Sequence, residues 1–519
     1  MFTRAITRAA HGVLVGLFLA TAGLGSAQAA PKVGGTLTFG LPTDLTKLDP
    51  HKSSAFVDTT ILMHVVEPLV TYNKKLEIRP LLADSWKFSA DYTSLTMNLA
   101  KGKTFHNGRE MVADDVVWSF KRLLDPETKN PKRSLFENIA KVTALDAHTV
   151  RFDLAKPQPG FLHVLANANP IPAILPKETV DADGNITKLI GTGPFQFVEW
   201  KPTQYIELKR YAAYKSPAGP KDGLSGDRTP YIDTLKMVPV SEENVAVMAL
   251  LNKEIDVLQY FPAKYVEKYN KQYSKQGMVL SEVPGMSWYQ VFFGLNKPVT
   301  DNPDFRRAVA YALDLDEITR AAYMGHALVN PSVIPAQSGY YTKAQKTWVS
   351  KDLKKAKALL KKAGYKGEEV VIDTTKNYAP MYKQAIAMQS QMAAAGINAK
   401  VNVLEWPVLL KRLYGKDFQM LSFGIGPKPD PVSAYNYLRL SSAFDVYPEI
   451  KALVDKADST DDDALRRDLF DKIHLKTLDT VPWIEFYNYN YLNAYRDYVK
   501  GYETLSIGLP VLWGVWLDK

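Results

Sequence analysis

Apolar and polar residues alternate with a period of two in several short segments of the chain, which is the pattern of half-buried β-strands. The segment 36–41 shows it first, and the same alternation returns at 95–99 and 150–154. Elsewhere apolar residues recur at helical spacing, as they do after Asp352, and Gly364 stands where a helix ends in the left-handed conformation. Strands and helices alternate along most of the chain, which predicts an α/β fold.

Four local features of the sequence add to this prediction. A second helix is expected after Thr460-x-x-Asp463, because apolar residues follow this acidic start at helical spacing. The pair Asn107-Gly108 predicts a tight turn, since glycine accepts positive φ without steric cost. Gly191 and Gly193 are expected to allow a backbone crossing between the lobes, since Pro194 fixes φ nearby. The segment 216–230, rich in Gly, Pro, Ser and Asp, is expected to be a long surface loop.

Composition excludes several classes of protein. The chain has 519 residues, 46% apolar and 23% charged, which is enough for a large core and two or three structural units. The formal net charge of +9 is too dilute over this length to indicate a nucleic-acid-binding protein. The cysteine count is 0, which excludes disulfides, thiolate catalysis, iron–sulfur clusters and a lipidated N-terminal cysteine.

The N-terminal segment 1–29 has the pattern of a cleavable signal peptide. Arg4 and Arg8 precede an apolar run at 12–24, and Ala27-Gln28-Ala29 supplies a small-x-small cleavage site. The apolar run is shorter than the roughly 18 or more residues that span a bilayer, which disfavours a membrane anchor. No later segment reaches that length without charges. We therefore expect cleavage after Ala29 and a periplasmic protein with no membrane-inserted part.

The sequence lacks the usual motifs of catalysis and cofactor binding. It contains no G-x-S-x-G, no H-E-x-x-H and no Walker A sequence. The calcium-loop pattern that begins at Asp181 fails at Ile186 and Thr192. The histidines of the mature part are scattered singly, at His51, His64, His106, His148, His163, His326 and His474. We therefore expect a protein that is not an enzyme and has no cofactor or metal.

Several segments, in order along the chain, resemble the family 5 extracellular solute-binding proteins of ABC importers, the dipeptide/oligopeptide-binding class. These segments are Gly34–Gly40 with Leu48-Asp49-Pro50, Glu67-Pro68-Leu69, Arg79–Trp86, Phe105–Gly108, Ala113–Phe120, Gly191–Phe195, Phe305–Asp314 and Asp352–Tyr365. The resemblance implies a two-lobed periplasmic-binding-protein fold, type II-like, with an extra domain on the first lobe. Most of these motifs are expected to serve the fold and not the solute.

The resemblance also implies how the chain is divided. Residues 30–70, 187–285 and 487–519 would form the first lobe, and 71–186 would be the appended domain. Residues 286–486 would form the second lobe. Such a protein buries a polar solute between its lobes, where unpaired polar groups would each cost about 1–3 kcal/mol. The cleft must therefore supply charges, backbone groups and aromatic walls.

Four candidate binding residues come from two segments. Ser53 and Phe56 follow the first strand and could offer a hydroxyl and an aromatic edge to the solute, while a helix N-cap is the competing interpretation of Ser53. Trp288 and Tyr289 are candidate walls where the chain enters the second lobe. Because adjacent strand residues point to opposite faces, at least one of this pair is expected in the core.

Five further candidates lie in the second lobe. Lys376 and Tyr378 follow a strand at 370–373, at a strand-to-helix crossing where cleft residues often lie. In dipeptide-binding relatives a cation near this point meets the solute carboxylate, and a solvated surface lysine is the alternative for Lys376. Trp406, Asp430 and Tyr435 resemble residues that meet the amino end of the solute, with helix capping as the alternative for Asp430.

One position departs from the dipeptide-binding pattern. The relatives carry an additional aspartate that anchors the free α-amine, and Pro427 stands at that position here. The resemblance then implies a periplasmic receptor, expected to be monomeric, that delivers a peptide or peptide-like solute to ABC transporter permease subunits and their ATPase. Opine-like sugar–amino-acid conjugates and metal chelates, heme included, remain open within this class. A periplasmic hydrolase or chaperone is the alternative from another class.

Overall fold

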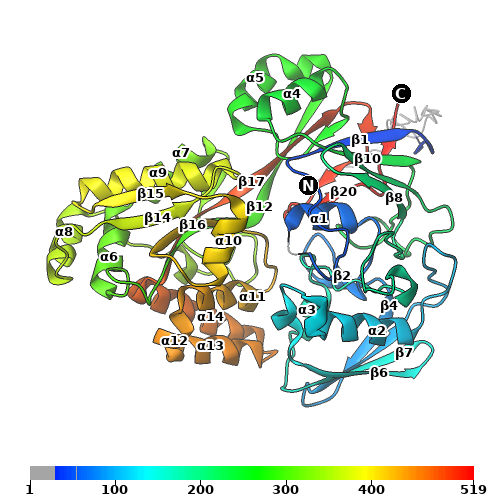
Figure 1. Ribbon diagram of the computed structural model, residues 1–519, viewed down its shortest axis with the longest axis horizontal. Helices are drawn as coiled ribbons and strands as arrows, with labels where there is room; N and C mark the ends of the chain where they lie inside the picture. Colours follow the sequence, from blue (N-terminus) through cyan, green and yellow to red (C-terminus); the bar gives the residue numbers. More distant parts are fainter. Residues whose placement is uncertain (1–29, 54) are drawn as a thin grey trace, which may run out of the picture.

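The computed structural model describes residues 30–53 and 55–519 of the chain. Two lobes lie side by side, and a single large sheet passes through both of them (Figure 1). The predicted signal peptide lies outside the described residues. The α/β prediction and the two-lobed arrangement are confirmed.

The sheet has 11 strands, and its order is β15-β14-β16-β12-β17-β11-β1-β10-β9-β8, with β13 beside β17. Two long antiparallel strands in the middle, β12 (Met278–Phe293) and β17 (Trp483–Arg496), belong to both lobes. Their pairing register shifts between Pro284 and Trp288 and again between Tyr289 and Gln290. The backbone is therefore irregular at the point where the two lobes join.

The first lobe is built on the strands at one end of this sheet. Its strands are β1 (Thr36–Leu41), β8 (Phe195–Lys201), β9 (Tyr205–Arg210), β10 (Thr234–Pro239) and β11 (Val257–Leu258), and its helices are α1 (Phe56–Leu62), α4 (Glu243–Leu251) and α5 (Val266–Lys271). Strand β1 runs parallel to both β10 and β11. Trp513 and its apolar neighbours near the C-terminus pack into the core beneath this part of the sheet. The end of the chain thus returns to the lobe in which it began.

A second, four-stranded sheet with its own core lies below the first lobe in Figure 1. It contains β4 (Ala83–Phe88), β5 (Ser94–Leu99), β6 (Ile139–Asp146) and β7 (Thr149–Leu154), with α2 (Ala113–Leu124) and α3 (Phe161–Leu165). Two short strands, β2 (Val70–Tyr72) and β3 (Ile78–Pro80), pair next to it. We call this unit the appended domain. Its boundaries, and those of the lobes, stay predictions.

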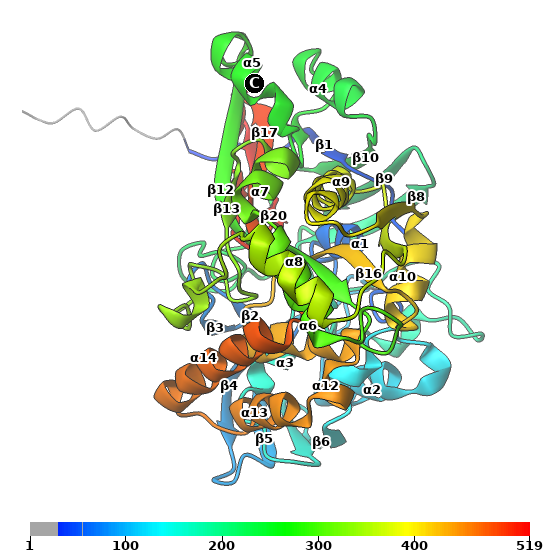
Figure 2. The same ribbon diagram turned by 90° about the vertical axis from the view of Figure 1, so that its left-hand side faces the viewer.

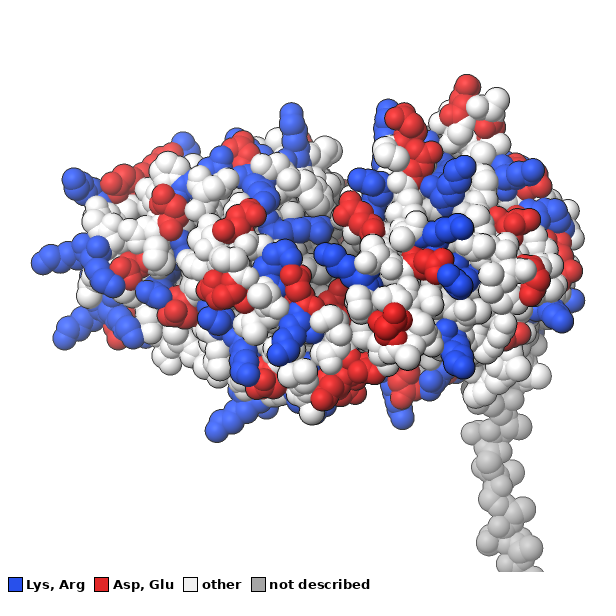
Figure 3. Space-filling view, turned by 90° about the horizontal axis from the view of Figure 1, so that it is seen from below, with Lys and Arg blue, Asp and Glu red and all other residues white. Residues whose placement is uncertain are grey.

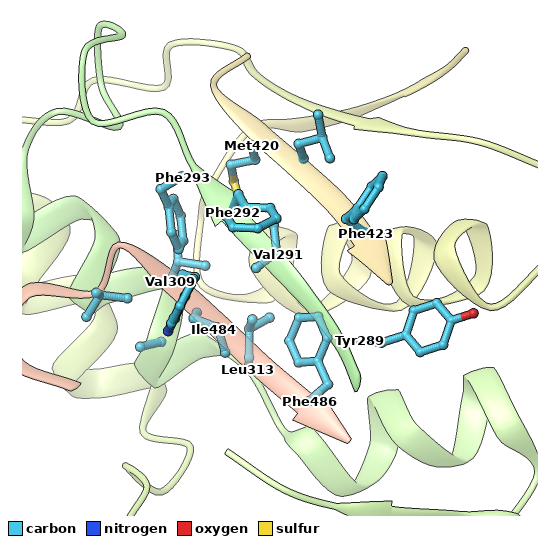
Figure 4. Close-up of a cluster of buried hydrophobic side chains, with 14 of the residues drawn as sticks. Tyr289, Val291, Phe292, Phe293, Val309, Leu313, Met420, Phe423, Ile484 and Phe486 are labelled. Carbon is cyan, nitrogen blue, oxygen red and sulfur yellow. The ribbon is translucent and has the colours of Figure 1, made fainter. Parts of the chain in front are cut away.

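The second lobe is built on the other end of the large sheet. Its strands are β13 (Ala327–Val329), β14 (Val370–Thr374), β15 (Ala399–Val403) and β16 (Met420–Ile425), and its helices are α6 (Pro303–Ala312), α7 (Leu315–Tyr323), α8 (Leu353–Lys362), α9 (Ala379–Ala394), α10 (Trp406–Tyr414), α11 (Pro431–Tyr435), α12 (Ala443–Val446), α13 (Pro448–Asp458) and α14 (Asp463–Thr480). Figure 2 looks onto α6 and α8, which pack together on this lobe. Side chains of β12, β16 and β17 meet in its core (Figure 4).

The local predictions are mostly confirmed. Helix α8 begins after Asp352, whose carboxylate accepts a hydrogen bond from the Lys355 amide, and Gly364 has a φ of +72°. Gly108 closes the predicted turn with a φ of +86°. The predicted start of α14 is wrong by two residues, because Asp462 caps the helix instead of Thr460.

A close backbone crossing exists at Gly191, but it joins two segments of the first lobe and does not run between the lobes as predicted. A Cβ atom at Gly191 would lie 2.0 Å from the carbonyl oxygen of Val65. We expect Gly191→Ala to lower the free energy of unfolding by about 1–3 kcal/mol, because the backbone must move to relieve the overlap. Gly339→Ala is the matched control, since its Cβ would meet no atom within 4 Å. Equal calorimetric melting temperatures for the two variants would contradict the crossing.

Candidate functional site

A cluster of tyrosines lies where β12 and β17 connect the two lobes. We call Tyr289, Tyr323, Tyr487, Tyr489 and Tyr491 the hinge tyrosines. The rings of Tyr289 and Tyr487 stack with centroids 5.3 Å apart, and those of Tyr323 and Tyr489 stack at 5.1 Å. Tyr487, Tyr489 and Tyr491 alternate along β17, so their side chains share one face of the strand. The cluster is thus an aromatic floor between the lobes.

A glycine on the neighbouring strand makes room for this floor. Gly424 of β16 is paired with Tyr289 of β12 in the sheet. A Cβ atom at Gly424 would lie 2.6 Å from the Tyr289 ring, so only glycine lets the ring lie over the strand. This close approach gives the glycine-containing segment before Asp430 a packing role next to the hinge.

Three predicted aromatic residues surround the floor and keep accessible surface. Tyr378 is 40% exposed, and its ring meets that of Trp406 edge-on at 4.7 Å. Trp406, the first residue of α10, stacks on Phe423 of β16 at 5.4 Å. Phe56, the first residue of α1, faces these residues from the first lobe, because a Cβ atom at Gly426 would lie 3.8 Å from its ring.

A carboxyl group of the first lobe also affects the pKa of Tyr378. Burial among the surrounding aromatic residues raises the pKa of Tyr378 to about 12, with smaller contributions from Tyr489 and from Asp58 of α1. Asp58 itself is fully buried and accepts a hydrogen bond from the Ser53 hydroxyl, so it acts on Tyr378 through its charge and not through contact with a solute.

The second part of the site is a buried ion pair. Asp430, at the start of α11, accepts a hydrogen bond at 2.5 Å from the guanidinium group of Arg466 on α14. Asp430 is 7% exposed, and its side chain makes no capping hydrogen bond to α11. The capping alternative for Asp430 is therefore wrong. Its charge is already balanced by Arg466, which a solute amine would have to share.

The appended domain covers this ion pair from the other side. The Tyr72 hydroxyl and Nδ1 of His163 lie 2.9 Å apart. Burial raises the pKa of Tyr72, and the nearby charge of Asp430 adds to the shift. Burial lowers the pKa of His163, against the opposing influence of Asp430. The ion pair and these two rings therefore lie within electrostatic reach of each other across the junction.

Direct hydrogen bonds also join the second lobe to the appended domain. The Gln158 amide donates to Asp458 at the end of α13, with a distance of 3.4 Å, and the Tyr92 hydroxyl donates to Asp461. Burial raises the pKa of Asp458 to about 6, and the neighbouring Asp430 raises it further against the lowering effect of Gln158. The lobes are thus in contact in this structure, and a carboxyl group lies at the contact.

Four predicted site residues lie outside both the aromatic cluster and the buried ion pair. Ser53 is buried and donates from its hydroxyl to Asp58 at 2.6 Å, while Ala55 occupies the N-cap of α1. Trp288 and Tyr435 are fully buried in the second-lobe core, so neither offers surface to a solute in this arrangement. Lys376 is exposed, with its ammonium group 5.1 Å from the centroid of the Tyr382 ring.

Both Trp288 and Tyr289 are buried in the second-lobe core, which confirms that at least one of the pair packs there. Trp288 donates from its indole nitrogen to Gln290 inside the second lobe, while Tyr289 belongs to the hinge tyrosines. The contacts of all nine predicted residues with a solute stay predictions.

Sequence reasoning missed several residues of the junction. Arg466 and Asp430 are 36 positions apart, and no local pattern connects them. Asp458 gives no signal either, because it ends an ordinary amphipathic helix. The hinge tyrosines do leave a signal in the sequence, since Tyr487, Tyr489 and Tyr491 alternate as expected for one face of a strand.

Other features of the described part of the chain point to no competing site. A surface hollow of about 600 Å³ lies on the first lobe beside Asp49 and Trp200, and none of the nine predicted residues lines it. Among residues 30–53 and 55–519, no group of three or more His, Cys, Asp or Glu side chains is arranged to hold a metal ion. Within the same residues, no helix combines the length and apolar character needed to cross a membrane. Acidic and basic side chains are mixed over the face shown in Figure 3.

Comparison with known proteins identifies the class of protein to which this chain belongs. Residues 77–445 match the model of the bacterial extracellular solute-binding proteins, family 5. The glutathione-binding protein GsiB of Escherichia coli K12 is 27% identical over 404 residues, which cover 77% of this chain and 75% of that protein.

Two solved structures extend the likeness over nearly the whole chain. The binding protein AgaA of A. tumefaciens R10, in complex with agropinic acid, is 26% identical with a TM-score of 0.81, and the match covers 93% of this chain and 99% of AgaA. The periplasmic binding protein DppA of Helicobacter pylori, in complex with the peptide STSA, is 27% identical with a TM-score of 0.81, and the match covers 94% of this chain and 99% of DppA.

The two lobes, the paired strands between them and the matched structures define a two-lobed solute-binding protein. The chain belongs to the family 5 extracellular solute-binding proteins, which serve ABC importers. The relatives named above are binding proteins and not enzymes.

Because the pKa of Asp458 is raised, we expect the replacement of Asp458 to change the stability of the protein in a pH-dependent way. The folded protein binds the carboxyl proton of Asp458 more tightly than the unfolded chain does. The protonated carboxyl group therefore makes its full contribution to stability below about pH 4, and this contribution is lost as the pH rises through about 6. Asp458→Asn keeps the neutral form, so it should stabilise the protein by about 1–2 kcal/mol more at pH 7.5 than at pH 4.5. Urea unfolding at the two pH values measures this difference.

Asp455→Asn provides the control for Asp458→Asn, because Asp455 is exposed on the same helix and pairs with Lys451 at the surface. This control variant should show no comparable change between the two pH values. The burial argument fails if Asp458→Asn changes the stability equally at pH 4.5 and pH 7.5.

Proposed function

We propose that this protein is a periplasmic receptor that encloses a peptide-like solute, bearing an amine and a carboxylate, by closure of its two lobes. The observation that supports this most is that Phe56 of the first lobe lies beside Gly426 of the second lobe, in which Tyr378 and Trp406 contact each other, and that all three aromatic residues keep accessible surface. Of the nine predicted site residues, these three are the ones we propose as solute contacts.

Closure explains why the site is divided between lobes. A peptide-like solute has charges and amides that lose hydration when they are buried, and the protein must replace their partners. Aromatic faces supply apolar contact area and attract the ammonium group of a solute. Because the walls come from two lobes, the complete site exists only when the lobes meet. A membrane permease can then distinguish the loaded form by its shape.

The relatives support a peptide-like solute. Glutathione, the peptide STSA and agropinic acid are the ligands named for GsiB, DppA and AgaA. At the position where dipeptide-binding relatives anchor the amine with an aspartate, this chain has Pro427, which weakens the case for simple dipeptides. Longer peptides and opine-like conjugates are therefore the two candidate solute classes, the second supported by the likeness to AgaA.

Export and delivery complete the proposal. Residues 1–29 would direct export and be removed after Ala29, which leaves the mature protein in the periplasm. The loaded receptor would act as a monomer and pass its solute to permease subunits driven by their ATPase. The proposed division keeps 30–70, 187–285 and 487–519 in the first lobe, 71–186 in the appended domain and 286–486 in the second lobe.

Calorimetric titration against peptides of two to five residues, glutathione and opines tests the proposal, with small-angle scattering to detect compaction. Tyr378→Ser should weaken the binding of any solute found by about 1–2 kcal/mol, because it removes an aromatic wall. Tyr311→Ser is the matched control. Tyr311 lies on α6 and bonds Lys355 of α8, away from the junction of the lobes, so its loss should leave affinity unchanged. Equal losses in both variants, or binding without compaction, would contradict the proposal.

A further inference from the structure

A tyrosine at the edge of the first lobe adopts a backbone conformation that bulky residues rarely take. Tyr260 lies two residues after β11, and its φ is +58°. In this left-handed region the Cβ atom of an L-residue crowds the backbone, so glycine and asparagine are favoured there and an aromatic residue is uncommon. A feature other than local backbone preference must therefore hold Tyr260 in this conformation.

Hydrogen bonds to β17 hold the backbone of Tyr260 in place. The amide of Tyr260 donates to the side-chain oxygen of Asn493 at 3.0 Å. The amide of the next residue, Phe261, donates to the carbonyl oxygen of Leu492 at 2.6 Å. The surrounding fold thus imposes a strained conformation on an aromatic residue. Conformations of this kind cluster at ligand-binding and active sites, where the surrounding structure sustains the strain.

The topology of the large sheet places Tyr260 at the same edge as the proposed solute contact Phe56. Strand β1 runs parallel to β11, with Gly40 opposite Leu258. Tyr260 follows the carboxyl end of β11, and Phe56 lies beyond the carboxyl end of β1. In open α/β sheets, ligands bind outside the carboxyl ends of parallel strands. Tyr260 therefore lies at the edge of the first lobe where a solute is expected.

The ring of Tyr260 extends the hinge tyrosines into the first lobe. Its centroid lies 6.3 Å from that of Tyr491, which meets Tyr489 edge-on at 5.1 Å. Tyr491 is itself held in place, because it packs directly on Gly508 and its hydroxyl bonds that of Ser287. Tyr260 and Tyr489 both keep accessible surface. A row of contacting rings therefore runs from Tyr260 to the aromatic floor between the lobes.

Packing alone does not account for this tyrosine. Among residues 30–53 and 55–519, the four apolar cores include its neighbour Phe261 but not Tyr260. Over the same residues the hydroxyl of Tyr260 makes no hydrogen bond, whereas those of Tyr487 and Tyr491 have partners inside the protein. Burial raises the pKa of Tyr260 well above its ordinary value, so the hydroxyl keeps its proton and can donate it in a hydrogen bond.

We propose that Tyr260 is a solute-contacting residue of the first lobe, whose ring packs on the solute and whose hydroxyl donates a hydrogen bond to a solute oxygen. The acceptor is a carbonyl or carboxylate oxygen, which peptides and opine-like conjugates both carry. The inference rests on the proposed function, because it requires a solute between the lobes. It also explains the strained conformation, since glycine or asparagine would suit the backbone but would offer the solute no aromatic ring.

Two substitutions separate the ring from the hydroxyl. Ala-Ala-Ala, glutathione and agropinic acid are titrated calorimetrically at pH 7.0. For the probe that the wild type binds most tightly, Tyr260→Phe should weaken binding about threefold to tenfold, because one hydrogen bond is lost. Tyr260→Asn also removes the ring, in a residue type that tolerates positive φ, and should weaken binding about tenfold or more.

Lys253→Asn is the matched control, because Lys253 is exposed on the first lobe and has a φ of +64°. This variant should bind the same probe with the affinity of the wild type. Unchanged affinity in both Tyr260→Phe and Tyr260→Asn overturns the contact. A loss in Tyr260→Asn alone supports the packing of the ring on the solute and overturns the hydrogen bond.

The melting temperature of the protein without solute gives a second test. Tyr260→Asn relieves the backbone strain and removes a ring that belongs to no core, so it should not lower the melting temperature; Lys253→Asn measures the effect of strain relief alone. If no probe binds, the peptide-like solute is contradicted and the melting temperature decides on Tyr260. An unchanged or raised value supports a ligand-contacting role, whereas a clear fall shows a structural role and overturns the inference.

Discussion

The pairing of β12 with β17 is the constraint on which the rest of the molecule depends. Buried backbone groups must stay hydrogen-bonded, so these two strands remain paired as they pass from one lobe to the other. Each lobe keeps its own core, and the apolar clusters on the two sides are separate. A bend at the irregular register near Gly285 can therefore move one lobe relative to the other without disturbing either core. A Cβ atom there would lie 2.3 Å from the carbonyl oxygen of Tyr489, so the position has no room for a larger residue.

Charges at the junction set the balance between open and closed forms. The contact between the second lobe and the appended domain gains hydrogen bonds through Gln158 and Tyr92. It also buries Asp458, which raises the pKa of this carboxyl group and opposes closure at pH values above about 6. A receptor needs such opposition, because a solute can shift the equilibrium only by its difference in affinity for the two forms. If closure were already favourable in the empty protein, binding of a solute could not shift the equilibrium between the open and closed forms.

The sequence predicts those parts of the structure that depend on neighbouring residues. The helix after Asp352, the turn at Gly108 and the crossing at Gly191 follow from short-range rules of capping, positive φ and missing Cβ atoms. The pair Asp430–Arg466 could not be predicted in this way, because it is made by tertiary packing of two helices. Composition also gave no indication that Trp288 and Tyr435 are enclosed, since an aromatic residue suits a core and a cleft equally well.

The two halves of the candidate site therefore serve different chemistry. The hinge tyrosines are neutral, because burial raises the pKa of Tyr289 and Tyr487 far above the physiological range, and both side chains pack in the second-lobe core. The carboxylate of Asp430, in contrast, is balanced by the guanidinium group of Arg466.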